Sequence, residues 1–163
     1  MKRSDDYIVE SSDVLIDEAE RSGIDVIRCR LPQNGACSVM DAWGHCTIGI
    51  DDWACTEAVA RARVAHEMGH CARGAFYNIY AADDVIGKHE RRADEWAIMR
   101  LIPERDFRRA VRSGYTEAWM IAERFCVPIE YACKTMYFYA ERARVREEKR
   151  KKRHRKFSCA VEK

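Results

Sequence analysis

The sequence lacks the features of an exported or membrane-spanning protein. No apolar run approaches the ~20 residues that a membrane-crossing helix needs. The N-terminus becomes acidic at once and has no apolar segment of the kind that a signal peptide requires. We therefore expect a cytoplasmic protein with no membrane partner.

The chain also lacks any Cys-x-x-Cys pair, although it contains 8 cysteines. Without such a pair, a zinc knuckle built from thiolates is not expected. Without an export signal the thiols should stay reduced, so a disulfide framework is not expected either. We expect the cysteines to act mostly as small hydrophobic residues.

No large excess of charge is present, but the charge is unevenly distributed. The formal net charge is +2 over 163 residues, of which 47% are hydrophobic and 34% charged. This composition is typical of one soluble domain with a proper core. Residues 141–163 hold 11 Lys/Arg and 4 Asp/Glu, so a mildly acidic body ends in a basic tail.

The first part of the chain predicts one helix followed by a small sheet. Apolar residues at helical spacing predict a helix over residues 7–21, which Ser22 and Gly23 end. Residues 32–35 have the composition of a turn. Strands are predicted, from β-branched and partly alternating sequence, over residues 24–31, 36–42 and 45–50. The last two flank Trp43-Gly44 and read as a hairpin.

The strongest helix is predicted over residues 57–73, which are rich in Ala, Arg and Val. Thr56, or the aspartates at 51 and 52, could cap its N-terminus, and Gly74 could cap its C-terminus. An irregular segment, residues 75–87, should then separate this helix from the next.

The C-terminal half predicts further helices. Asp83, Asp84 and Gly87 are expected to act as breakers before them. The helices are predicted over residues 89–102, 104–112, 116–125 and 129–144. Residues 145–156 form a charge run that could extend the last helix or stay disordered.

One motif within the strongest predicted helix indicates a metal site. His66, Glu67 and His70 form the H-E-x-x-H pattern, with both histidines on one helix face because they lie four residues apart. Two imidazoles so placed can share a zinc ion, and a carboxylate beside them can take a proton from the zinc-bound water. Such a motif is short, so its context decides its meaning.

A catalytic zinc site usually takes a third protein ligand. Glu90 lies in the next predicted helix and would complete a His2Glu site. Asp94 shares its helix face and could accept the free ring N–H of a ligand histidine. Ala93 and Ala97 are small enough to let the two helices approach closely.

These blocks together resemble the ImmA/IrrE metallo-endopeptidases. The members of that family typically read H-E-[LIM]-G-H, then E-x-x-A-[ND]-x-[FW]-A, and here the blocks are His66–His70 and Glu90–Ala97. The resemblance covers about residues 45–140. It implies that His66, His70 and Glu90 bind one Zn²⁺ and that Glu67 is the catalytic base, with Mn²⁺ left open. Asp94 departs from the more common asparagine, but an aspartate suits the same role.

The resemblance implies an α+β fold. We expect a small zincin-like domain of the minimal gluzincin type, in which a short, mainly antiparallel sheet packs on the H-E-x-x-H helix. The expected division is a metallopeptidase domain over residues 1–112, a helical extension over 113–144 and a basic, flexible tail over 145–163.

The implied function is zinc-dependent hydrolysis of an internal peptide bond. The substrate implied by the family is a helix-turn-helix repressor of the phage or mobile-element type. The residue that stabilises the oxyanion is not identified by the sequence, and Tyr77, Tyr80, His89 and Arg91 are the candidates.

A different class of function stays open. Residues 118–132 resemble a helix-turn-helix, but the second helix begins with apolar and acidic residues, which favours a structural or protein-docking role over DNA reading. The basic tail could contact nucleic acid, an acidic partner or nothing. The alternative hypothesis is therefore a non-catalytic module that binds a regulator or DNA.

Overall fold

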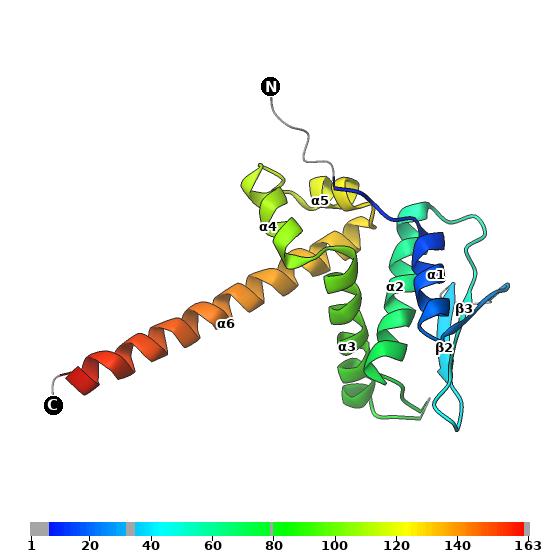
Figure 1. Cartoon of the computed structure of the whole chain (residues 1–163), viewed down its shortest axis with the longest axis horizontal. Coiled ribbons are helices and arrows are strands. Elements are labelled where there is room, and N and C mark those ends of the chain that lie inside the picture. The colour runs from blue at the N-terminus through cyan, green and yellow to red at the C-terminus, as the bar shows by residue number, and fades with distance from the viewer. Residues whose placement is uncertain (1–6, 32–34, 79, 162–163) are drawn as a thin grey trace.

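The computed structural model describes residues 7–31, 35–78 and 80–161, with side chains as far as Arg153. A three-stranded sheet lies against one side of the central helix α2 (Glu57–Arg73), and helix α3 (Asp83–Leu101) packs on the other side (Figure 1). The predicted α+β fold is confirmed.

The sheet contains β1 (Asp25–Arg28), β2 (Ala36–Met40) and β3 (Cys46–Ile50), in the order β1-β3-β2. The predicted hairpin is confirmed, because β2 pairs antiparallel with β3. β1 is shorter than predicted and pairs parallel with β3, so the sheet is mixed. The turn predicted over residues 32–35 lies largely outside the described residues. β2 is an edge strand, which leaves one row of its backbone groups unpaired within the sheet.

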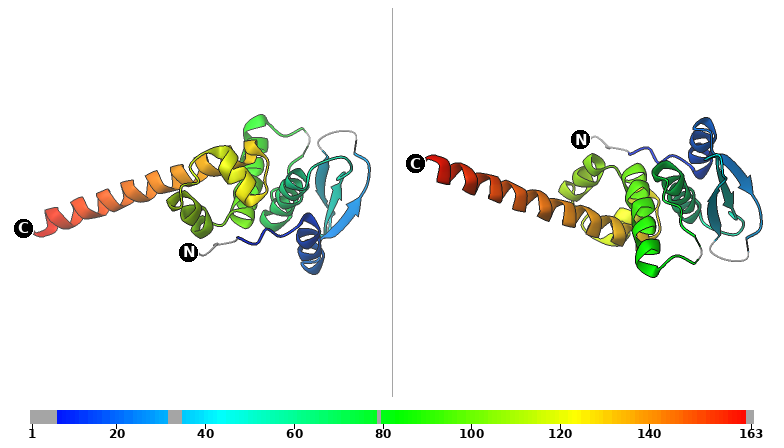
Figure 2. Two further views of the ribbon diagram at one scale, coloured as in Figure 1. Left: turned by 90° about the horizontal axis from the view of Figure 1, so that it is seen from above. Right: turned by 90° about the horizontal axis from the view of Figure 1, so that it is seen from below.

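Helix α1 (Ser12–Arg21) packs against α2 beside the sheet (Figure 2). It begins five residues later than predicted, because Ser11 acts as N-cap and its side chain accepts a hydrogen bond from the Val14 N–H. Its end at Ser22 is as predicted. Leu15 and Ala19 are fully buried and join the core below the sheet.

Helix α2 has the predicted bounds. Thr56, not the preceding aspartates, is its N-cap, and the Thr56 side chain accepts a hydrogen bond from the Val59 N–H. Gly74 ends the helix in the left-handed conformation, which glycine adopts without steric cost. Buried residues follow α2 on both sides, as expected of a helix between two layers.

Helix α3 begins at Asp83, six residues before the predicted start. The prediction that Asp83, Asp84 and Gly87 break the helix was wrong. The two aspartates lie in the first turn, where carboxylates interact favourably with the helix dipole. Gly87 is exposed within the helix, at a position with open space around it, so only its propensity cost of about 1 kcal/mol opposes the helix.

The C-terminal half consists of α4 (Glu104–Arg112), α5 (Ala118–Phe125) and α6 (Ile129–Val161). α6 is one helix of 33 residues, or about 50 Å at 1.5 Å per residue. Its C-terminal half extends away from the other elements (Figures 1 and 2). The charge run thus continues the helix, and the expected division between residues 144 and 145 falls within it.

Two further observations concern membrane-spanning helices and disulfide bonds. No helix in the described part of the chain is long and apolar enough to cross a membrane. The seven cysteines whose side chains are described are all free thiols.

Candidate metal centre

The two histidines of the motif lie in the last two turns of α2 and point at one spot. The Nε2 atoms of His66 and His70 are 3.1 Å apart. Each ring donates its other N–H to an oxygen: His66 Nδ1 to Asp94 Oδ1 at 3.0 Å, and His70 Nδ1 to the Ala75 carbonyl at 2.7 Å. In neutral rings these hydrogen bonds leave both Nε2 lone pairs facing one another, an arrangement that a cation between them would relieve.

Glu90 of α3 supplies the third group. Its Oε2 lies 3.2 Å from His66 Nε2, and its Oε1 lies 3.4 Å from His70 Nε2. A tetrahedral zinc ion, bonded at about 2.0–2.1 Å to each atom, holds its ligand atoms about 3.3 Å apart. Each imidazole Nε2 thus lies at about this distance from a Glu90 oxygen, and one ligand atom from each of the three residues lies within 4.8 Å of the others. In the described part of the chain, these three residues are the one group of three or more His, Cys, Asp or Glu with metal-site spacing.

The close approach of α2 and α3 makes this convergence possible. A Cβ atom added at Gly69 would lie 2.6 Å from the carbonyl oxygen of Ala93 and 3.0 Å from its Cα. The two helices thus touch backbone to backbone, one residue from His70 and three from Glu90. The expectation that Ala93 permits a close approach is confirmed, and Gly69 is its counterpart on α2.

Asp94 holds His66 in place, as the helical spacing predicted. Burial would raise the pKa of Asp94, but the hydrogen bonds from His66 and Lys134 outweigh it and lower that pKa. Burial would likewise lower the pKa of His66, but the hydrogen bond to Asp94 and the nearby Glu67 and Glu90 raise it. The raised pKa of His66 reflects the carboxylates around it, whereas the lowered pKa of Asp94 reflects the two groups that donate hydrogen bonds to it.

Sequence reasoning missed Lys134, whose Nζ donates a hydrogen bond to Asp94 Oδ2 at 2.8 Å. This lysine lies in α6, 40 residues from its partner and before the basic run of residues 141–163, and a single lysine at such a position gives no signal in the sequence. Only the packing of α6 against the metal centre reveals it.

Of the four candidate oxyanion donors, the structure brings Tyr77 to the centre. Its hydroxyl donates to Glu90 Oε1 at 2.6 Å, and this hydrogen bond raises the pKa of Tyr77 to about 12. Tyr80 is 89% exposed. The His89 ring lies beside Tyr77, with 6.0 Å between ring centroids, and Arg91 is exposed.

Glu67 lies next to the ligands in an open cleft of about 880 Å³. Its side chain is only 8% exposed, so it faces the cleft from a largely buried position. The cleft is lined by residues 36–39 of the edge strand β2 and, from other elements, by Tyr77, Tyr131 and Lys134. A carboxylate beside a potential metal ion, in an open cleft, is suited to general-base chemistry.

The comparisons with known proteins agree with this site. The profile of the IrrE N-terminal-like domain family, Peptidase_M78, matches residues 19–137. A solved structure, a Mycobacterium tuberculosis transcriptional regulator, is similar in fold with a TM-score of 0.56 at 16% sequence identity. The match covers 75% of this chain and 39% of that one, so this chain spans about two fifths of its length. No curated protein sequence matches significantly.

The profile match spans both the helix with His66 and His70 and the helix with Glu90. Because it also covers most of the chain, the resemblance seen in the motif blocks extends to the whole arrangement of sheet, α2 and α3. The chain belongs to the Peptidase_M78 family of IrrE N-terminal-like domains, a metallopeptidase-type family.

Proposed function

We propose that this protein is a zinc-dependent endopeptidase that hydrolyses an internal peptide bond of a protein substrate. The observation that carries the proposal is the convergence of His66, His70 and Glu90, whose potential ligand atoms all lie within 4.8 Å of one another beside Glu67. A bound Zn²⁺ would polarise the scissile carbonyl and make the attacking water more acidic.

Each side chain of the centre has a role in this proposal. Glu67 accepts the proton of the attacking water and passes it to the leaving amine, as a general base and then a general acid. Tyr77, whose hydroxyl already faces the ligand Glu90, donates a hydrogen bond to the carbonyl oxygen as negative charge develops there. Asp94 keeps His66 in the tautomer that presents Nε2.

The edge strand β2 supports a peptide as substrate. Ala36 to Val39 line the cleft, and an edge strand offers backbone N–H and C=O groups to an extended segment. Following the family resemblance, the substrate that we propose is a cytoplasmic helix-turn-helix repressor of the phage or mobile-element type, cleaved in a segment that can become extended.

Glu67→Gln tests the proposal. This variant should keep its fold and its zinc, but cleavage should fall by about 100-fold or more because the proton acceptor is lost. The assay is incubation with the product of the adjacent open reading frame, with cleavage products identified by mass spectrometry and zinc measured by elemental analysis. The proposed mechanism would be excluded if the Glu67→Gln variant cleaved as fast as the wild type and if the wild type kept its activity in a zinc chelator.

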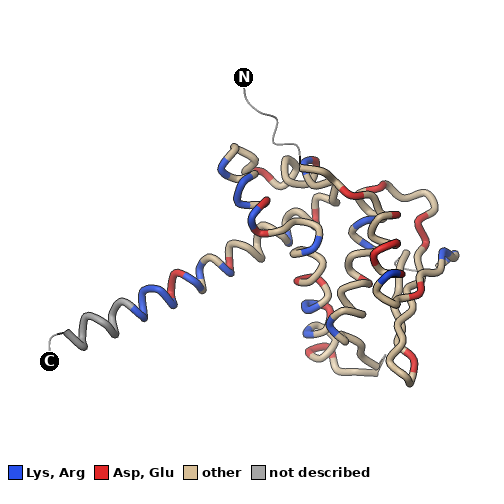
Figure 3. The backbone as a smooth tube through the Cα atoms, viewed as in Figure 1, with Lys and Arg blue, Asp and Glu red and all other residues tan. Residues whose placement is uncertain are grey.

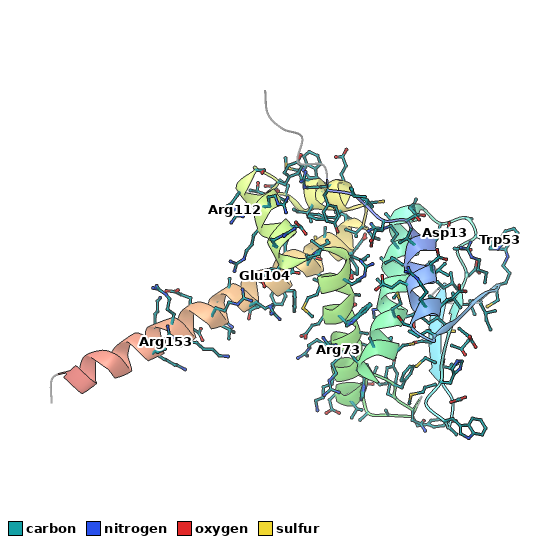
Figure 4. All side chains as sticks on the ribbon, in the orientation of Figure 1. Asp13, Trp53, Arg73, Glu104, Arg112 and Arg153 are labelled. Carbon is teal, nitrogen blue, oxygen red and sulfur yellow. The ribbon has the colours of Figure 1, made fainter. Side chains whose placement is uncertain are left out.

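A second candidate function, a nucleic-acid-binding module, is favoured by α6. The run Lys149 to Arg153 contains five consecutive cations, all exposed, on the part of the helix that extends from the body (Figures 3 and 4). A projecting basic helix is complementary to the phosphates of a duplex, whereas the first 140 residues carry a net charge of −5.

Replacing these five cations by glutamine tests the second candidate. Binding of a duplex of about 20 base pairs should weaken, and the slope of log K against log salt should flatten by about three or more, because each phosphate contact contributes about 0.9. The matched control removes five exposed cations from the body: Lys88, Arg91, Arg92, Arg105 and Arg112. If both sets of substitutions weakened duplex binding equally, a specific role for α6 would be contradicted. Cleavage that depends on Glu67 would favour the endopeptidase over the nucleic-acid-binding module.

A further inference from the structure

A short chain of hydrogen bonds connects the C-terminal helix to the metal centre. Lys134 Nζ donates to Asp94 Oδ2 at 2.8 Å, and Asp94 Oδ1 accepts from His66 Nδ1 at 3.0 Å. This series of hydrogen bonds therefore ends at the imidazole of His66, whose Nε2 faces Glu90. These hydrogen bonds join α6 to the consecutive helices α3 and α2, which precede it in the sequence.

Asp94 alone would hold His66 poorly. Its side chain is 23% exposed and lines the cleft, so its carboxylate can rotate toward the cleft or toward the metal ligands. A hydrogen bond on each oxygen fixes the plane of the carboxylate and thus the direction in which it accepts from His66. Lys134 also supplies a positive charge that balances the carboxylate of Asp94. A neutral asparagine at this position would not need such a charge.

We propose that Lys134 is a positioning residue of the metal centre, which orients His66 through Asp94 and makes the ligand geometry depend on the docking of α6. This inference rests on the proposed function, since it requires that the centre holds a metal. It assigns to the C-terminal part of the chain a direct contact with the site, in addition to its packing role.

The alternative is that the pair is an ordinary surface salt bridge. The Lys134 side chain is 57% exposed, and exposed ion pairs typically contribute little to stability. The two interpretations differ in what they affect. A surface pair changes nothing at the metal, whereas loss of a partner that orients a metal-binding histidine typically weakens metal binding 10- to 100-fold.

The test compares Lys134→Met with Lys134→Arg. Zinc affinity is measured by competition with a chromophoric chelator, the ligand geometry by the visible spectrum of the Co²⁺-loaded protein, and the fold by urea unfolding of the metal-free protein. Lys134→Met should weaken zinc binding about tenfold and change the Co²⁺ spectrum without moving the urea midpoint. Lys134→Arg should restore most of the affinity, because it can donate to the same oxygen.

Two controls make the result specific. Lys88→Met removes an exposed lysine that pairs with Asp84 on α3, outside the residues that line the cleft, and should leave zinc binding unchanged. In an Asp94→Asn background, Lys134→Met should have a much smaller effect, because the two substitutions act on one interaction. If Lys134→Met had the same zinc affinity and Co²⁺ spectrum as the wild type, this inference would be overturned but the proposed function would stand. If the wild-type protein itself bound no zinc, the proposed function would be overturned.

Discussion

At the scale of single residues, the centre combines three potential metal ligands with groups that orient them. His66 and His70 each use one ring nitrogen for a hydrogen bond, to Asp94 and to the Ala75 carbonyl, and are left with one for a metal. Glu90 presents both oxygens and is itself hydrogen-bonded by Tyr77. Every potential ligand is therefore held by a neighbour, which is the arrangement that a preorganised metal site would need.

Tyr77→Phe separates two roles of this tyrosine. If the hydroxyl stabilises the oxyanion, kcat should fall about 100-fold while zinc affinity stays within a few-fold of the wild type. Steady-state kinetics on the cleaved substrate and a zinc competition assay measure the two effects. A large loss of zinc affinity with unchanged kcat in the loaded enzyme would show instead that Tyr77 serves to orient Glu90.

At the scale of elements, the contact between α2 and α3 determines where Glu90 meets the histidines. The contact is made by backbone, because Gly69 has no Cβ and Ala93 has only a methyl group. Any side chain at position 69 would collide with the carbonyl of Ala93, and a backbone cannot move aside as a flexible side chain can.

Gly69→Ala should therefore weaken both the fold and the site. Alanine gains about 1 kcal/mol over glycine in a helix, but overpacking against backbone costs about 1–3 kcal/mol, so we expect a net loss of up to about 2 kcal/mol. Zinc affinity should fall about tenfold or more, since a ligand must stay within about 0.5 Å of its place. Urea unfolding and zinc competition are the measurements.

Gly87→Ala is the matched control in α3, because a Cβ there meets no atom within 4 Å. It should stabilise the protein by up to about 1 kcal/mol and leave zinc binding unchanged. Equal stabilisation by both alanine substitutions would contradict the importance of the close approach at Gly69.

At the scale of the whole molecule, α6 joins the C-terminal half to the metallopeptidase-type body. Lys134 reaches the metal centre, the Tyr139 hydroxyl donates to the Ile102 carbonyl at 2.6 Å, and Arg146 forms an ion pair with Glu104 of α4. Between α2 and α5, the buried Arg61 donates to the carbonyls of Phe125 and Cys126. The helical part is thus attached at several points along its length.

The contact between α4 and α6 should depend on pH. The hydrogen bond from Arg146, with Arg108 and Arg142 nearby, holds the pKa of Glu104 below its usual value of 4.5. The stabilisation is therefore present above that value and is lost as the pH falls through the lower pKa of the folded state. Urea unfolding between about pH 3 and 6 should show this loss in the wild type, and Glu104→Gln should reduce it. If the free energy of unfolding fell equally with decreasing pH in both proteins, the loss of stability could not be assigned to Glu104.

The sequence by itself determined what depends on near neighbours. The four-residue spacing of His66 and His70 places them on one face wherever the helix forms, Gly74 ends that helix, and Asp94 follows Glu90 by one turn. The N-cap was left open between Thr56 and the aspartates at 51 and 52, and the structure shows that it is Thr56. The sequence-based prediction was wrong about the start of α3, because residues typical of loops are also tolerated in a helix. Asp83 and Asp84 lie in its first turn, and Gly87 lies at an exposed position one turn further along. Local patterns cannot separate these outcomes, since packing further along the helix decides between them.

The tertiary structure alone decided what depends on distant segments. It placed β1 parallel to β3, continued α6 through the charge run, selected Tyr77 among four candidates and brought Lys134 to Asp94 across 40 residues. The physical reason is that these contacts arise from close packing of whole elements, above all of α2 on α3 at Gly69 and of α6 beside α3. The spacing of residues along one helix carries no information about which helix will lie next to it.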